Sequence, residues 1–190
     1  EVTHRLAVEA VVAAGDARES GGLQVAVDSS PPAASTTPDL LPSSDTGSSS
    51  NDNITAIAAP AFQGSGEANA TVQILADGIV VGDGLVGSDE SDGNPTNGLG
   101  IWEVTVEPLA DSDYTITAVL EDAAGNISTQ GEGLGITIDS AMPQRPTIDL
   151  VDADDTGVSS TDNITIGRWA VADFRISAEM GPTVMIKDGE

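Results

Sequence analysis

Short runs of alternating apolar and polar residues, separated by clusters of Gly, Asp, Asn and Ser, recur along the chain. Val104 and Val106, then Ile116 and Ala118, follow the period of two that a half-buried strand requires. No amphipathic helical pattern competes with this alternation. The pattern predicts strands near Thr37–Leu41, Asn53–Ala58, Ala70–Ala76, Ile79–Val81, Gly100–Val106, Tyr114–Leu120 and Gly133–Ile138. The fold class is therefore expected to be all-β.

The pattern returns after about 110 residues, a size that suits one hydrophobic core. Asp39–Thr55 recurs as Asp149–Thr165, and Ala13–Asp16 recurs as Ala123–Asn126. About seven short strands in such a unit are typical of an immunoglobulin-like β-sandwich. The segments between the units are proline-rich, and proline stiffens such linkers toward an extended geometry. We expect tandem immunoglobulin-like β-sandwich domains in an extended array, in which residues 1–31 end one repeat, residues 32–142 form a complete repeat and residues 143–190 begin the next.

The chain is strongly acidic, with a formal net charge of −25 and only 6 Lys and Arg residues. This charge repels phosphate backbones and anionic membrane surfaces, so we expect neither nucleic acid nor a membrane as a partner. Divalent cations would offset the repulsion among the carboxylates. The chain has no cysteine, so packing, metal or both must stabilise it. No stretch reaches the roughly 20 apolar residues of a membrane-spanning helix.

Residue combinations typical of catalysis are missing from the predicted complete repeat. The single histidine, His4, precedes it, so a Ser-His-Asp triad has no histidine there. The chain also lacks a thiol nucleophile and a glycine-rich phosphate loop. We expect structural roles for Trp102, in the core, and for Tyr114, in a tyrosine corner at the entry to a strand. The sequence therefore predicts that the protein is not an enzyme.

Acidic loops are predicted to meet at one end of the sandwich. Asp45 and Asp52 lie between the first two strands, in a loop expected at the end of the sandwich where the chain leaves the domain. Asp111–Asp113 and the linker residue Asp139 are expected at the same end. Oxygen atoms from three segments suit Ca²⁺, which takes about 6–8 oxygen ligands. Clusters of Asp, Asn and Ser are also ordinary turn chemistry, so turns without metal are the alternative. The acidic loop Ser88–Asn94 has no repeated counterpart and is expected to be a solvated insertion.

A series of motifs covers nearly the whole chain. Its members are Asp45–Thr55, Asp77-Gly78, Trp102, Leu109 with Tyr114–Ala118, Asp122–Ser128 and Ile136–Ser140. This series resembles the bacterial immunoglobulin-like repeats that form the extender regions of giant type I-secreted adhesins and biofilm-associated proteins. The first copy departs from it at His4 and Val12, and the third departs after Thr165, where Trp169–Met180 replaces a Gly-Ser-Gly-rich turn around Gln63–Glu67.

The resemblance implies a secreted, non-enzymatic stalk on the bacterial cell surface that supports cell adhesion and biofilm formation. Calcium would stiffen its interdomain joints. Its partners would be neighbouring immunoglobulin-like repeats of the same chain, and another domain would bind the adhesive target. The implied calcium ligands are Asp45, Asp52, Asp111, Asp113 and Asp139, with Asp155 and Asp162 in the next repeat.

Two other functions remain open at this point. The repeat itself could bind a glycan or a protein, a function that exposed aromatic residues on one face would favour. Aromatic residues make up only 3% of the chain, which argues against such a face. The chain could also be an accessory module of a large secreted hydrolase, whose catalytic domain would then lie outside these residues.

Overall fold

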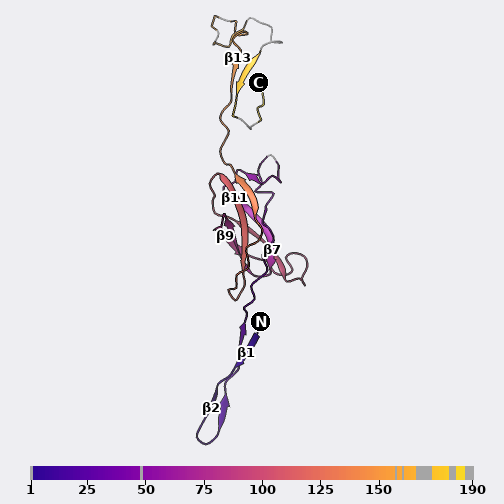
Figure 1. The fold of residues 1–190 in the computed structure, drawn as a ribbon, viewed down its shortest axis with the longest axis vertical. Helices are drawn as coiled ribbons and strands as arrows, with labels where there is room; N and C mark the ends of the chain where they lie inside the picture. Colours follow the sequence, from indigo (N-terminus) through magenta and orange to yellow (C-terminus); the bar gives the residue numbers. More distant parts are fainter. Residues whose placement is uncertain are drawn as a thin grey trace. The chain divides into compact units, whose positions relative to one another are not determined.

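A computed structural model describes residues 2–47, 49–156, 158–159, 161–165, 173–179 and 183–186. The chain divides into two units, Glu1–Ser140 and Ala141–Glu190, and each is described by itself. The described ranges contain strands and no helices, which confirms the predicted all-β class (Figure 1). Consequently, no helix in this part of the chain is long and apolar enough to span a bilayer.

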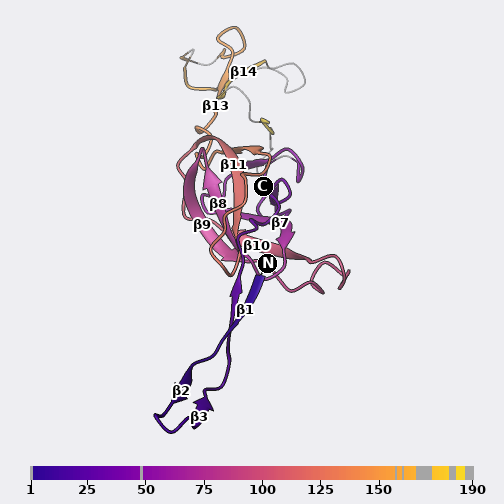
Figure 2. The ribbon, with the colours of Figure 1, turned by 60° about the horizontal axis from the view of Figure 1, so that its bottom comes forward.

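Residues 32–140, called the central domain below, form two facing β-sheets. Their strands are Asp39–Leu40 (β5), Ile54–Thr55 (β6), Ala61–Glu67 (β7), Thr71–Ala76 (β8), Ile79–Leu85 (β9), Leu99–Thr105 (β10), Ser112–Glu121 (β11) and Leu134–Ile138 (β12). One sheet has the order β10-β7-β5, and the other has the order β6-β12-β11-β8-β9. Figure 2 shows β11, β8 and β9 of the larger sheet side by side. Neighbouring strands are antiparallel except for β6 and β12, which run parallel. This is the arrangement of an immunoglobulin-like sandwich.

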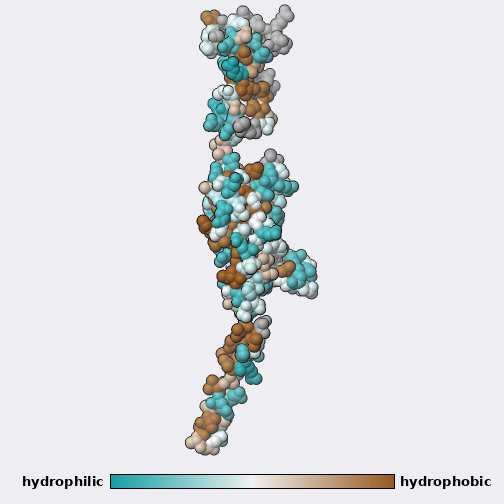
Figure 3. Space-filling model, viewed as in Figure 1, coloured by the Kyte–Doolittle hydropathy of each residue, from teal (hydrophilic) through white to brown (hydrophobic). Residues whose placement is uncertain are grey.

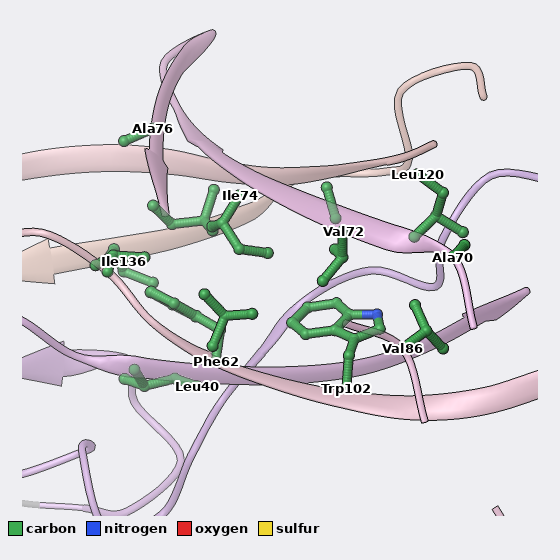
Figure 4. Close-up of a cluster of buried hydrophobic side chains, with 14 of the residues drawn as sticks. Leu40, Phe62, Ala70, Val72, Ile74, Ala76, Val86, Trp102, Leu120 and Ile136 are labelled. Atoms are coloured by element: carbon green, nitrogen blue, oxygen red, sulfur yellow. The ribbon is translucent and has the colours of Figure 1, made fainter. Parts of the chain in front are cut away.

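The core lies between the two sheets and follows the alternation in the sequence. The strand β8 alternates buried and half-buried residues, and β10 alternates buried and exposed ones. Figure 4 shows Phe62 and Trp102 of one sheet pointing toward Val72 and Ile74 of the other. These side chains are buried together, so the apolar face of each sheet is covered by its partner.

The strand β7 corrects the predicted turn around Gln63–Glu67. These residues form the middle strand of the three-stranded sheet instead. Their glycines are explained by close packing: a Cβ on Gly64 would collide with the Trp102 ring, and one on Gly66 would lie 2.5 Å from Leu120 Cδ1. Glycine therefore makes room here for large core side chains, which local turn signals do not reveal.

Two predicted strands are much shorter in the structure, and one is much longer. The ladder of β5 is only two residues long and lies between Pro38 and Pro42, which lack the N–H group that a ladder needs. The strand β6 begins after Asn53, whose φ of 57° is left-handed rather than extended. The strand predicted at Ile79–Val81 continues to Leu85 as β9.

An antiparallel ribbon precedes the central domain in the sequence. It consists of Val2–Leu6 (β1) paired with Leu23–Val27 (β4), and of Glu9–Val11 (β2) paired with Ala17–Glu19 (β3). The pairing repeats that of β11 with β12: Val2 faces Val27 and Leu6 faces Leu23, as Ser112 faces Ile138 and Ile116 faces Leu134. Val11 likewise faces Ala17, as Glu121 faces Ile127. Residues 2–27, called the ribbon below, thus repeat the last strand pair of the central domain.

The unit Ala141–Glu190, called unit 2 below, contains Thr147–Leu150 (β13) and Phe174–Ser177 (β14). These strands are antiparallel, with Asp149 facing Arg175 and Leu150 facing Phe174. The strands β5 and β7 pair in the same way, with Asp39 facing Gln63 and Leu40 facing Phe62. Trp169–Met180 was expected to replace the turn around Gln63–Glu67. The strand β14 lies in that range and is instead the counterpart of β7. Trp169 and Met180 themselves lie outside the described residues.

Candidate functional site

A depression at one end of the central domain contains two of the predicted acidic residues, Asp52 and Asp113. It has a volume of about 310 Å³ and is lined by Asp52, Asn53, Asp77, Asp113, Tyr114, Thr115, Gly135, Ile136 and Thr137. The lining comes from the loop before β6, the β8–β9 turn, the start of β11 and β12. These segments are distant in sequence and meet because β12 lies between β6 and β11. We call this end of the domain the acidic pole.

Asp45 lies in the loop between β5 and β6 and is buried, with 7% of its surface exposed. Its backbone N–H donates to the Leu41 carbonyl at 3.0 Å, which closes a tight turn after β5. One carboxylate oxygen, Oδ2, accepts the Asn53 N–H at 3.3 Å, while the other, Oδ1, is buried without a hydrogen-bond partner. A buried carboxylate oxygen that lacks a partner is costly, and a bound cation would compensate it.

Asp52 is held close to the same loop. Its Oδ1 accepts the Ile54 N–H at 3.2 Å, and its Oδ2 accepts the Ser49 N–H at 3.2 Å. A Cβ on Gly47 would lie 2.7 Å from Asp52 Oδ1 and 2.7 Å from the Ile54 carbonyl oxygen, so only glycine fits there without displacement. The loop therefore brings carboxylate and carbonyl oxygens together, which are the ligand atoms that Ca²⁺ prefers.

The described residues of the second copy of this loop, in unit 2, have matching hydrogen bonds. Asp155 is buried, with 5% of its surface exposed, and its Oδ1 is also buried without a partner. Its Oδ2 accepts the Asn163 N–H at 3.3 Å, and Asp162 Oδ1 accepts the Ile164 N–H at 3.1 Å. Asn163 has a φ of 58°, like Asn53 at 57°. Gly157 and Ser160 of this copy lie outside the described residues.

Asp111 and Asp139 lie where the chain leaves the central domain. Asp111 Oδ1 accepts the Ser140 Oγ–H at 2.7 Å and the Ser140 N–H at 3.0 Å. These bonds, the side-chain one first, hold the pKa of Asp111 below its ordinary value. The Asp139 N–H donates to the Thr55 carbonyl at 2.9 Å. The carboxylate of Asp111 thus ties the linker to the acidic pole.

Asp113 and Asp77 accept hydrogen bonds within the sandwich. Asp113 Oδ1 accepts the Thr137 Oγ1–H at 2.6 Å, and Asp77 Oδ1 accepts the Thr115 N–H at 2.9 Å. Asp77 was not among the predicted site residues. Its Asp-Gly dipeptide, with positive φ at both positions, is typical of a type I′ hairpin turn and is the signal that could have placed it beside β11.

Four of the predicted ligands differ in their hydrogen bonding. Asp45, with Asp155 in the second copy, has a buried and unpartnered oxygen, whereas Asp111 and Asp113 accept hydrogen bonds from the protein. In the described part of the chain, no three His, Cys, Asp or Glu side chains lie close enough together to hold one metal ion. A cation at Asp45 would need carbonyl oxygens and water to complete its ligands. The ligand assignments stay predictions.

The two predicted structural aromatic residues have the expected environments. The Tyr114 hydroxyl donates to the Ala110 carbonyl at 3.1 Å, the geometry of a tyrosine corner. Trp102 is buried, and its Nε1–H donates to Ser35 Oγ at 3.2 Å. Both predictions are confirmed. Tyr114 ties the start of β11 to the loop before it, and Trp102 ties β10 to the segment before β5.

Two further acidic turns lie outside the acidic pole. Asp92, in the loop Ser88–Asn94, accepts the Asn97 Nδ2–H at 2.7 Å, which lowers the pKa of Asp92 together with a backbone bond from Asn94. Asp122 has a lowered pKa because of the Asn126 side chain at 2.8 Å and the N–H groups of its own turn. Ordinary turn chemistry accounts for both carboxylates.

Comparison with known proteins agrees with this architecture. Among curated proteins, none matches the sequence. The family model described as "Bacterial Ig-like domain" matches residues 32–140, which is more than half of the chain and coincides with the two-sheet central domain. On this match and on its strand topology, the chain belongs to the bacterial Ig-like domain family.

Proposed function

We propose that this protein is a non-enzymatic structural extender of a bacterial cell-surface adhesin, in which calcium stiffens the joints between successive immunoglobulin-like repeats. The observation that carries the proposal is the path of the chain through the central domain. The chain enters at one end of the sandwich and leaves at the other, so in a row of such repeats each domain would add its full length.

Contacts of the two linkers define this path. On the entry side, the Asp28 carbonyl accepts the Asn126 Nδ2–H at 3.2 Å, beside the end of β11. On the exit side, Ser140 donates to Asp111, beside the start of β11. The ten residues of β11 separate these contacts, and a strand rises about 3.3 Å per residue, so the two ends lie roughly 30 Å apart.

The acidic pole supports the calcium part of the proposal. It adjoins the exit linker, and its loop is repeated in unit 2 with the same buried, unpartnered carboxylate oxygen. Asp45 and Asp52 would hold the ion in the central domain, and Asp155 and Asp162 would hold it in unit 2. Bound calcium would supply positive charge that neutralises carboxylates at the joint. With a net charge of −25, their repulsion is large, and its removal would favour one fixed joint geometry.

The extender role also has consequences for location and partners. We place the protein outside the cell, where millimolar calcium would fill weak sites. Its partners would be neighbouring repeats of the same chain, and another domain would bind the adhesive target. Phe62 and Trp102 are buried in the central domain, so neither side chain provides an exposed aromatic platform for a glycan.

Small-angle scattering of the full chain, with calcium and with a chelator, tests the proposal. We expect calcium to increase the maximum dimension and to narrow the distribution of conformations. The double variant Asp45→Asn with Asp155→Asn should lose this response. The control Asp83→Asn removes one charge from an exposed position on β9 and should keep it. Identical scattering in calcium and in sodium chloride of equal ionic strength would contradict calcium stiffening.

A further inference from the structure

Asp45 is an acidic side chain that lies below the surface of the central domain. Figure 3 shows the visible face of this domain covered largely by hydrophilic and neutral residues, as expected for an acidic chain. Asp45, however, is only 7% exposed, and its Oδ1 is buried without a hydrogen-bond partner. Asp155 repeats both properties in the second copy of the loop. Burial of an unpartnered carboxylate oxygen is costly, so the loop needs a compensating contact to keep this position.

The strand β6, which follows this loop, is too short to be stable by itself. It has two residues and forms two pairs with β12, Ile54 with Thr137 and Thr55 with Ile138. Parallel pairs are slightly less stable than antiparallel ones, and most strands are longer than this one. Within the described residues, β6 lies at the edge of its sheet and pairs with no other strand. Contacts with the preceding loop must therefore help to hold it.

Asn53, the residue before β6, connects Asp45 to β12. Its N–H donates to Asp45 Oδ2 at 3.3 Å, and its carbonyl accepts the Thr137 N–H at 2.9 Å. The left-handed φ of 57° allows these two groups to reach different partners, and asparagine tolerates this conformation. In the second copy, Asn163 has a φ of 58° and the same bond to Asp155. A movement of the Asp45 carboxylate therefore acts directly on the bond from Thr137.

Thr55 makes a second connection between the loop and β12. Its side chain is buried, and its Oγ1 lies 3.1 Å from the Oγ1 of Thr46, the neighbour of Asp45. The second copy repeats this threonine pair at 3.2 Å. The Thr55 carbonyl accepts the N–H of Asp139, the linker residue that follows β12, at 2.9 Å. The acidic loop thus contacts β6 on one side, and the exit linker is bonded to β6 on the other.

We propose that a calcium ion at Asp45 controls the pairing of β6 with β12, and through it the attachment of Asp139 to the sandwich. The proposal rests on the proposed function for the calcium site and adds the path from that site to the exit linker. This path consists of Asn53 and Thr55, each of which contacts the acidic loop and also accepts a bond from β12 or the residue after it. Calcium would thus order the end of the domain to which the joint is attached.

The buried oxygen of Asp45 determines the direction of the effect. Without an ion, an outward movement of the loop lets water hydrate Oδ1, and the loss of the Asn53 and Thr55 contacts then releases β6 from β12. With an ion, the oxygen is compensated where it lies, and the paired state is favoured. An ion that binds only the paired state raises its population relative to the released state by a factor of 1 + [Ca²⁺]/Kd, about 100 at one hundred times the Kd.

Amide hydrogen exchange of the full chain, in calcium and in chelator at equal ionic strength, measures this pairing at single residues. Thr137 and Asp139 report it, because their N–H groups bond to the segment that contains β6. We expect their exchange to slow by about tenfold for each tenfold rise in calcium above the Kd. The control is Asp122, whose N–H donates to the Asn126 carbonyl at 3.1 Å in a turn at the other end of β11. Its opening leaves the acidic loop intact, so its exchange should change by less than about twofold.

Two variants separate the ion site from the path. Asp45→Asn should abolish the calcium effect at both amides, because it removes a ligand. Thr46→Val keeps Asp45 and Asp52 but removes the hydroxyl that contacts Thr55. Calcium should still bind this variant in calorimetry, while the slowing at Asp139 should fall by about fivefold, the factor expected for one lost hydrogen bond.

The possible results distinguish this inference from the proposed function. Equal slowing at Asp122, Thr137 and Asp139 would overturn the inference, because calcium would then stabilise the domain as a whole. Scattering that responds to calcium without slower exchange at Thr137 and Asp139 would also overturn it and would leave joint stiffening intact. Slower exchange at these two amides without a change in scattering would support the pairing of β6 and refute joint stiffening. No calcium effect in either measurement would overturn both.

Discussion

Replacing Asp45 by Asn separates the cost of its buried carboxylate from any benefit of bound calcium. The substitution keeps the shape of the side chain and an acceptor for the Asn53 N–H, but it removes the charge. Asp45 is 7% exposed and its Oδ1 lacks a partner, a condition that costs about 1–3 kcal/mol of stability. In Asn, an amide nitrogen at this position would also lack a partner, so we expect a change of less than about 1 kcal/mol with chelator present.

With calcium present, the wild-type chain should become clearly more stable than Asp45→Asn. A ligand at one hundred times its Kd stabilises the folded state by about 2.7 kcal/mol, which corresponds to an increase in Tm of roughly 10 °C for a domain of this size. The wild-type chain should show this increase, and Asp45→Asn should lose most of it, because the uncompensated oxygen that attracts the ion is gone.

Thermal unfolding followed by circular dichroism, with excess calcium and with chelator, measures both effects. The control Asp83→Asn changes the net charge equally at an exposed site and should keep the calcium response. The reasoning fails if the wild-type Tm is unchanged by calcium, or if Asp45→Asn gains as much as the wild type.

Three further predictions concern packing and pH. Ser35→Ala should lower the free energy of unfolding by about 1–3 kcal/mol in urea titrations, because the buried indole N–H loses its acceptor; an unchanged midpoint would show that another acceptor replaces it. Gly66→Ala should destabilise the domain, since the new Cβ meets a buried leucine at 2.5 Å, whereas Gly135→Ala meets nothing within 4 Å and should be tolerated in the same assay. Asp122 has a lowered pKa through the Asn126 side chain, so its stabilising contribution should be present above the ordinary aspartate pKa of about 3.9 and should disappear as the pH falls through the folded-state value. Asp122→Asn should remove this part of the acid dependence in denaturation curves, and a curve that keeps its full dependence would contradict it.

The alternation of apolar residues was sufficient to predict the sheets because burial repeats with the period of the strand. Val104 and Ile116, for example, indicated which face of their strands is buried in the core. The strand β7 was missed because its glycines resemble a turn locally, and their reason is contact with Trp102 and Leu120 from other strands. Such long-range contacts are not visible in a local pattern.

Residues of the candidate site could be predicted from the sequence, but their burial and hydrogen-bond partners could not. The repeated spacing pointed to Asp45 and Asp155, yet only the fold shows that one oxygen of each is buried without a partner. The sequence placed Asp111 and Asp113 in the same group, although both accept hydrogen bonds from neighbouring hydroxyl groups. Asp77 lines the depression because the turn between β8 and β9 lies beside Thr115, whose N–H donates to Asp77. This contact depends on the order of strands in the sheet.

The parallel pairing of β6 and β12 has a mechanical consequence. A pull on the two linkers acts in opposite directions on strands near the two ends of the domain. When the tension reaches β6, the hydrogen bonds from Thr137 to Asn53 and from Asp139 to Thr55 lie across the direction of force. They are therefore loaded together in shear and must break at the same time, rather than opening one after another. The strand pair that closes the sandwich is thus also a clamp against stretching.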